Sequence, residues 1–105
     1  GVQVLDVATY EKKMTQPDVQ LVDVRTPEEF SQGHIENAVN IDFMADDFDA
    51  KVANLDKEKP VMVYCKSGGR SAKASARLKE LGFKTITDLE GGITNWTSEE
   101  KPTVK

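Results

Sequence analysis

Four consecutive apolar residues, Val61 to Tyr64, lead directly into Cys65, the only cysteine of the chain. The next five residues, Lys66 to Arg70, include two glycines and two cations. An alanine-rich helical pattern then runs from Ser71 to Leu81. A fully apolar strand followed by a short loop and a helix is typical of folds whose parallel strands are buried on both faces. This order predicts that Cys65 lies at the carboxyl end of a central strand, beneath the start of a helix.

Short apolar strands and helices alternate along the rest of the chain. The predicted strands cover residues 3–5, 19–24, part of 34–42, 61–64 and 83–89. The predicted helices cover residues 7–14, a short stretch from Pro27, 44–55, 71–81 and 93–96. This alternation predicts an α/β fold with a small, mainly parallel sheet and helices on both faces. A chain of 105 residues has room for a single domain, residues 1–105, whose polar tail, 97–105, we expect to fray.

Local residue patterns mark where two of the helices begin. Asp6 directly precedes the first predicted helix and can cap its free N–H groups. Thr26 can cap the second, with Pro27 at its first position and Glu29 completing a capping box.

Polar segments follow several of the predicted strands. They are Asp23 to Arg25, Asp42, Cys65 to Arg70 and Glu90 to Gly92. In open parallel sheets, ligand sites form outside the carboxyl ends of the strands. We therefore expect these four segments to converge on one pocket.

The composition excludes several classes of function. Charged residues make up 30% of the chain and the formal net charge is −4, so it has no general attraction to nucleic acid or to an anionic membrane surface. No apolar run reaches the length of about 18 residues that could span a bilayer. A single cysteine excludes an internal disulfide and a thiol-only metal site, and no pattern indicates a metal or another cofactor. No leader is visible, which leaves the compartment open between the cytoplasm and, if a leader was removed, the periplasm.

The loop after Cys65 has the residues of an anion-binding site around a reactive thiol. A thiolate is the reactive form of cysteine, and a helix N-terminus with nearby cations favours it. The glycine pair allows successive backbone N–H groups to point inward as an anion-binding nest, and two serines add hydroxyl donors. The candidate site residues are the nucleophile Cys65 and, as ligands of an anionic substrate, Lys66, Ser67, Gly68, Gly69, Arg70 and Ser71.

These motifs resemble those of the rhodanese-like domain family, the sulfurtransferases, over nearly the whole chain. The N-terminal resemblance lies in Leu21–Arg25, Glu28–Phe30, Gly33–Ile35 and Ala38–Ile41. The active-site resemblance lies in Val63–Cys65 with Gly68, Arg70 and Ser71, and the C-terminal resemblance in Leu89–Ile93 followed by Trp96. In this order and within this length, the motifs together are highly specific.

The resemblance implies a sheet of about five strands and covalent catalysis in two displacement steps. The Cys65 thiolate would attack the outer sulfur of a donor such as thiosulfate, which releases sulfite and leaves a persulfide. Cyanide or a cellular thiol would then take that sulfur. The loop N–H groups would hold the persulfide, while Lys66 and Arg70 orient the donor. The implied partners are a small anionic sulfur donor, a thiol acceptor and, in one version, a protein that gives or accepts sulfur, with the chain acting as a monomer.

Two other functions remain open. A sulfur carrier or binding module of the same family would use the same loop with a protein persulfide donor, and would turn over little thiosulfate. A dual-specificity phosphatase also uses a cysteine loop ending in arginine, but its loop surrounds a phosphate and is one residue longer. Here four residues separate Cys65 from Arg70, and Tyr64 stands where tyrosine phosphatases carry histidine. The tighter loop favours a single sulfur over a phosphate.

Other polar residues have simpler interpretations. The cations further along the predicted 71–81 helix are typical of a solvated helix face: Lys73, Arg77 and Lys79. His34, the only histidine, is expected to be structural rather than a general base. Asp23 and Arg25 are expected to pair with neighbours near the sheet edge, although Arg25 could also line the pocket.

Overall fold

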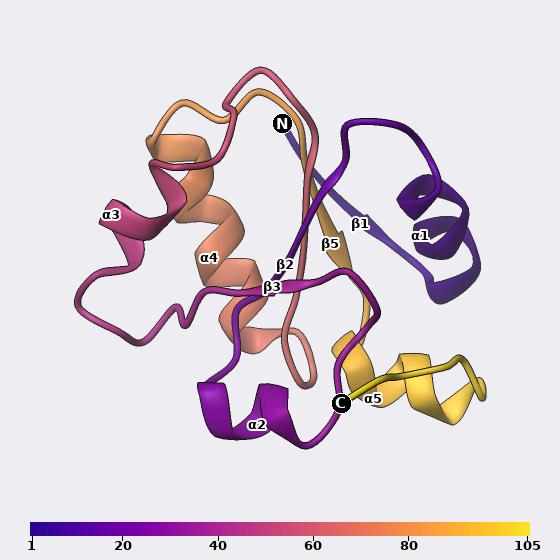
Figure 1. Ribbon diagram of the computed structural model, residues 1–105. Helices are drawn as coiled ribbons and strands as arrows, with labels where there is room; N and C mark the ends of the chain where they lie inside the picture. The colour runs from indigo at the N-terminus through magenta and orange to yellow at the C-terminus, as the bar shows by residue number, and fades with distance from the viewer.

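Five parallel strands form one sheet through the middle of the molecule, which the computed structural model describes from residue 1 to residue 105 (Figure 1). The strands are β1 (Val2–Leu5), β2 (Gln20–Asp23), β3 (Val39–Asn40), β4 (Val61–Tyr64) and β5 (Ile86–Leu89), in the spatial order β1-β5-β4-β2-β3. Every neighbouring pair is parallel, and β4 lies at the centre, between β2 and β5. The predicted α/β fold is confirmed, and Cys65 directly follows its central strand.

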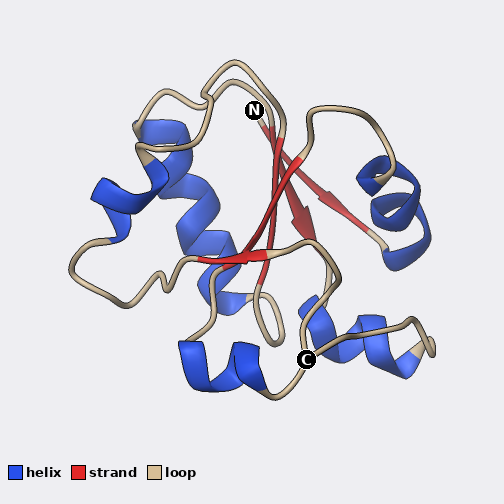
Figure 2. Cartoon of the chain, in the orientation of Figure 1, coloured by secondary structure: helices blue, strands red, loops and turns tan.

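Helices cover both faces of this sheet (Figure 2). They are α1 (Val7–Met14), α2 (Pro27–Ser31), α3 (Phe48–Val52), α4 (Gly69–Glu80) and α5 (Gly92–Ser98). The helices α3 and α4 lie on one face and α1 on the other, while α2 and α5 lie toward the end where β2, β4 and β5 finish (Figure 1). None of the helices is long and apolar enough to cross a membrane.

Each residue of β4 is buried, but successive side chains enter different cores. Val61, Val63 and Cys65 belong to a core that includes residues of α3 and α4. Met62 and Tyr64 belong to a second core, which includes residues of α1 and α5. Successive side chains of a strand point to opposite faces, and each large apolar side chain that is buried contributes about 1.5–3 kcal/mol. A strand covered on both sides therefore has to be apolar throughout, which explains the uninterrupted run.

Both predicted helix starts are present. The Asp6 carboxylate accepts the Thr9 N–H at 2.9 Å at the start of α1. At α2, the Thr26 hydroxyl accepts the Glu29 N–H at 3.3 Å, and Glu29 Oε1 accepts the Thr26 N–H at 3.2 Å. This reciprocal capping box, with Pro27 in the first turn, begins α2 shortly after β2 ends.

The two largest differences from the predicted helix ranges concern α3 and α4. The predicted helix over 44–55 is wrong in its extent, because α3 covers only Phe48–Val52. The Asp42 carboxylate accepts the Met44 N–H at 2.9 Å, and such a local side-chain bond competes with helix formation and holds the segment in a turn. In contrast, α4 begins at Gly69, two residues before the predicted start, because Gly68 turns the chain into the helix with a left-handed φ of +114°.

Residues 97–105, the tail that we expect to fray, make contacts with the rest of the fold. The helix α5 extends into this range, and beyond it the chain end is held by long-range bonds. Trp96 Nε1 donates to the Pro102 carbonyl at 2.8 Å. The backbones of Val104 and His34 exchange two hydrogen bonds of 2.8 Å each. Polar composition alone does not indicate a frayed end when the backbone groups find partners within the fold.

Candidate active site

A short loop joins the end of the central strand to α4 (Figure 1). Cys65 is the first residue of this loop, directly after β4. Its Sγ accepts the Gly68 N–H at 3.0 Å, and its thiol donates to the Ser71 Oγ at 3.4 Å. Only 1% of Cys65 is exposed. The thiol therefore lies beneath the start of a helix, as the sequence predicts. It is covered by the loop and is not exposed to solvent.

The start of α4 adds backbone donors to the same loop. Gly68, which precedes the helix, has a left-handed φ of +114° that glycine adopts without steric cost. No protein group accepts the N–H groups of residues 69–71, which form the first turn of α4. These free donors lie at the positive end of the helix dipole, so they can hold an anionic atom beside Sγ. The side chains of Lys66 and Ser67 are exposed on the rim of the loop.

The helix α5 holds the other side of this loop. The N–H groups of Ile93 and Thr94 donate to the carbonyls of Cys65 and Lys66, at 2.9 and 3.0 Å. Gly92 has a φ of +61°, and a Cβ atom at this position would lie 2.5 Å from the Cys65 carbonyl oxygen. Glycine is therefore required for α5 to approach the loop so closely. The sequence predicts only a turn at this position. The feature that could have indicated the close contact is the pair of glycines placed directly before a helix.

Arg70 is not free beside the thiol, because its guanidinium forms a two-point ion pair with Glu29 of α2. The Nη1–Oε1 and Nη2–Oε2 distances are 2.6 and 2.9 Å. The pKa of Glu29 is lowered to about 2, chiefly by the hydrogen bonds from Arg70 and also by the capping bonds of Thr26, against the opposing effect of burial. The pair ties the loop to α2 and offsets part of the positive charge that the sequence places near the thiol.

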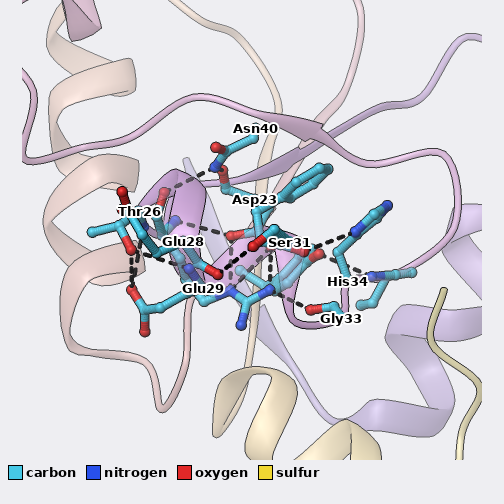
Figure 3. Close-up of polar contacts among 12 residues, drawn as sticks. Asp23, Thr26, Glu28, Glu29, Ser31, Gly33, His34 and Asn40 are labelled. Atoms are coloured by element: carbon cyan, nitrogen blue, oxygen red, sulfur yellow. Dashed lines mark hydrogen bonds and ion pairs between the residues drawn. The ribbon is translucent and has the colours of Figure 1, made fainter. Parts of the chain in front are cut away.

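A second ion pair lies buried at the end of β2, within a network of polar contacts (Figure 3). Arg25 Nη2 donates to Asp23 Oδ2 at 2.7 Å and to the Gly33 carbonyl at 2.8 Å. Asn40 Nδ2 donates to the carbonyls of Asp23 and Arg25, at 3.0 and 2.8 Å. The expected pairing of Asp23 and Arg25 is present. Their network fixes β3 and the turn after α2 against β2.

An open cavity of about 340 Å³ lies beside the loop, between α2 and α5. Its lining includes Arg25, Glu29, Lys66 and Thr94. The cavity brings together residues next to three of the four segments that we expected to converge, those after β2, β4 and β5. Cys65 is not part of its wall, because the thiol lies beneath the loop.

Three other residues singled out in the sequence lie outside this cavity. Asp42 belongs to the turn before α3, where it accepts the Met44 N–H. Arg77 pairs with carboxylates on the surface, including that of Asp49, in agreement with a solvated helix face. The His34 ring stacks on that of Phe30, with centroids 3.7 Å apart, and acts as a packing group there. No cluster of three or more His, Cys, Asp or Glu side chains is placed to hold a metal ion.

The chain is similar to known proteins along nearly its whole length. The family model described as rhodanese-like domain matches residues 6–99. A protein of Allochromatium vinosum named sulfurtransferase is 37% identical over 87 residues, which cover 83% of this chain and 79% of that protein. Thiosulfate sulfurtransferase 16, chloroplastic, of Arabidopsis thaliana is 37% identical over 92 residues, covering 78% of this chain and 77% of that one. Among solved structures, a rhodanese-related protein from Thermoplasma volcanium has a TM-score of 0.85 and 33% identity, with 97% of both chains covered.

The substitution Gly92→Ala should lower the free energy of unfolding by about 2–4 kcal/mol, because the new Cβ would press on the Cys65 carbonyl at a left-handed φ. Urea unfolding followed by circular dichroism measures this change. Gly69→Ala is the matched control, since a Cβ there meets nothing within 4 Å, and it should change stability by no more than about 0.5 kcal/mol. Equal losses of stability in the two variants would contradict the inference that Gly92 is required for the close contact between α5 and the loop.

The ion pair of Glu29 should make stability depend on pH in acid. The pKa of Glu29, about 2, lies below the ordinary value of 4.5. The contribution of its charge to the free energy of unfolding is therefore fully present above about pH 4.5 and is lost as the pH falls through about 2. Glutamine can keep the capping bonds but carries no charge, so Glu29→Gln should cost about 1 kcal/mol at neutral pH. Urea unfolding of both proteins at several pH values measures the difference. A difference that stays constant down to about pH 2 would show that the charge of Glu29 is not what stabilises the fold.

Proposed function

The chain belongs to the rhodanese-like domain family, and we propose that it is a sulfurtransferase in which Cys65 carries the transferred sulfur as a persulfide. The observation that carries this proposal is the position of Sγ, which accepts the Gly68 N–H at 3.0 Å beneath the free N–H groups of residues 69–71. Such donors stabilise a thiolate and, one bond further out, the terminal sulfur of a persulfide. The relatives named as sulfurtransferases support the same activity.

The proposed cycle has two displacements at sulfur. The Cys65 thiolate attacks the outer sulfur of thiosulfate, the S–S bond of the donor breaks, and sulfite leaves with the bonding electron pair. The new bond places the transferred sulfur about 2.05 Å beyond Sγ, where the N–H groups of residues 69–71 can hold its negative charge. Cyanide or the thiolate of an acceptor then attacks that sulfur. Cys65 leaves as a thiolate, and the cycle can begin again.

Two cations of the loop have different parts in this proposal. Lys66 is exposed and lines the cavity, so its ammonium group can attract the anionic donor. Arg70 shares its charge with Glu29 and therefore orients the loop and the donor more than it attracts the donor. Ser67 lies exposed on the rim, and the Ser71 hydroxyl contacts Sγ. In this proposal residues 1–105 act as one domain and as a monomer.

A sulfur carrier that receives sulfur from a protein persulfide is the second candidate, and the Arg70–Glu29 pair favours it. Because Glu29 offsets the charge of Arg70, the loop has less positive charge with which to hold a free dianion such as thiosulfate. A protein donor would instead bring its sulfur to the loop through surface contacts. The two candidates differ in the donor and share the persulfide on Cys65.

Incubation with thiosulfate should add the mass of one sulfur atom to the native protein and none to Cys65→Ala, because no other thiol is present to carry it. Intact-protein mass spectrometry measures the gain. Addition of sulfur from a persulfide-bearing protein but not from thiosulfate would favour the sulfur carrier. No gain from either donor would contradict the proposal, as would hydrolysis of p-nitrophenyl phosphate that depends on Cys65.

Removing either loop cation should weaken binding of the donor. We expect Lys66→Ala to raise the KM for thiosulfate by about tenfold, the equivalent of one charge-assisted hydrogen bond, and Arg70→Ala to raise it by a smaller factor, because Glu29 already offsets the Arg70 charge. Glu29→Gln should lower the KM, because Arg70 then keeps its full charge for the donor. Thiocyanate formation from cyanide provides the assay. Lys73→Ala, which removes an exposed cation of α4 outside the cavity, is the control. If this variant raised the KM for thiosulfate as much as the loop variants do, the effect would come from the net charge of the protein and not from the loop.

A further inference from the structure

Asp88 is a buried acid that the sulfur-transfer cycle above does not use. It is 4% exposed, and its Oδ1 atom has no hydrogen-bond partner. Burial raises the pKa of Asp88 above its ordinary value, while the Ser71 hydroxyl and the Leu89 N–H oppose that rise. A buried carboxylate with an unpartnered oxygen costs free energy and is uncommon in folded proteins.

The side chain of Asp88 faces the same side of the sheet as Cys65. In β5, Ile86 packs in the core on the α4 side and Leu89 packs in the other core, so alternation along the strand directs Asp88 toward α4. Val63 of β4 is the sheet partner of Asp88, and Cys65 lies two residues beyond it on the same face. With strands about 4.8 Å apart and a rise of about 3.3 Å per residue, the Cα atoms of Asp88 and Cys65 lie roughly 8 Å apart.

Ser71 lies in the gap between these two residues. It is fully buried in the first turn of α4, and its Oγ is 3.4 Å from the Cys65 Sγ. The same hydroxyl is near enough to Asp88 to favour the charged form of that carboxylate. At rest it donates to the Gly68 carbonyl at 3.3 Å, so passing a proton to Asp88 requires the hydroxyl to turn from that carbonyl toward the carboxylate. A hydroxyl donates one hydrogen bond while it accepts another, so Ser71 can pass a proton between two groups that do not touch.

We propose that Asp88 accepts the thiol proton of Cys65 through the hydroxyl of Ser71, an inference that rests on the function proposed above. The Cys65 proton moves to Ser71 Oγ as the Ser71 proton moves to a carboxylate oxygen of Asp88. The products are a Cys65 thiolate, an unchanged Ser71 hydroxyl and a neutral Asp88 carboxylic acid. The single negative charge leaves a carboxylate with an unpartnered oxygen and arrives on Sγ, which accepts the Gly68 N–H. Asp88 acts through Ser71 and does not touch the donor.

Few other charged or titratable groups face this path. The helix α4 contributes the charged Arg70, which Glu29 holds, and the residues paired with Asp88 on β1 and β4 are both valines. Tyr64 of β4 and Asp23 of β2 lie nearby on the opposite face of the sheet, as does Tyr10 of α1. The Tyr10 hydroxyl donates to a main-chain carbonyl of β4 at 2.8 Å, and burial raises its pKa well above the ordinary value, so it keeps its proton at neutral pH. Asp88 is therefore the acid that is placed to take the thiol proton on this path.

The rate of alkylation by iodoacetamide, measured against pH on the full chain, tests this proposal. When two groups share one proton, the fraction of thiolate stays constant with pH until that proton leaves. We expect a flat rate over roughly pH 5–7 in the native protein, and a rate that rises about tenfold per pH unit in Asp88→Asn. Ser71→Ala should show the same rise, because it keeps the acid and removes the bridge. Thr87→Val, which removes a different unpartnered buried hydroxyl of β5, should keep the flat profile.

A rate that rises about tenfold per pH unit in the native protein would overturn the proposal, because the thiol would then lose its proton to solvent. A flat profile that survives in Ser71→Ala would overturn the path through that hydroxyl. These measurements concern the resting thiol alone and are independent of persulfide formation. A protein with the flat profile that gains no sulfur from any donor would contradict the sulfurtransferase and support the proton path.

Discussion

The close contact between α5 and the carbonyls that follow β4 is the constraint on which the candidate site depends. The C=O and N–H of one peptide unit point in opposite directions. When Ile93 and Thr94 hold the carbonyls of Cys65 and Lys66, the next N–H groups of the loop face away from α5. The donors of the loop are therefore left for another acceptor, and α4 can begin within a few residues of the strand. Gly92 permits this arrangement because it has no side chain at the point of contact.

Local patterns predict the elements of this fold, while the contacts that shape the site join distant parts of the chain. The cap formed by Thr26 and Glu29 lies within four residues, and the apolar run of β4 follows from its two covered faces, so both are visible in the sequence. The pair of Glu29 and Arg70 joins residues 41 positions apart, and neither residue type indicates the other. The contact of Val104 also depends on His34, far away in the sequence, so the local composition of the tail does not indicate it.

Side-chain charge around the thiol is largely compensated. Arg25 is paired with Asp23 and Arg70 with Glu29, as is usual for cations that lose contact with water. The exposed Lys66 and the backbone donors of the loop are left as the main sources of positive potential. Donors fixed beside a buried sulfur are screened by salt much less than a surface charge. An anionic sulfur in this site would therefore be stabilised chiefly by backbone dipoles.

In the proposed cycle, the enclosure of Sγ would also influence which atom of the persulfide an acceptor reaches. Attack on the outer sulfur passes it to the acceptor, whereas attack on the inner sulfur would expel hydrosulfide and leave the acceptor joined to the protein in a mixed disulfide. Cys65 is only 1% exposed and Gly68 and Ser71 contact Sγ, so an acceptor would reach the inner atom less readily than the outer atom. The outer atom extends about 2 Å further, toward the loop donors. Shielding alone would thus give the reaction its regioselectivity and keep the cysteine from being trapped by its own acceptor.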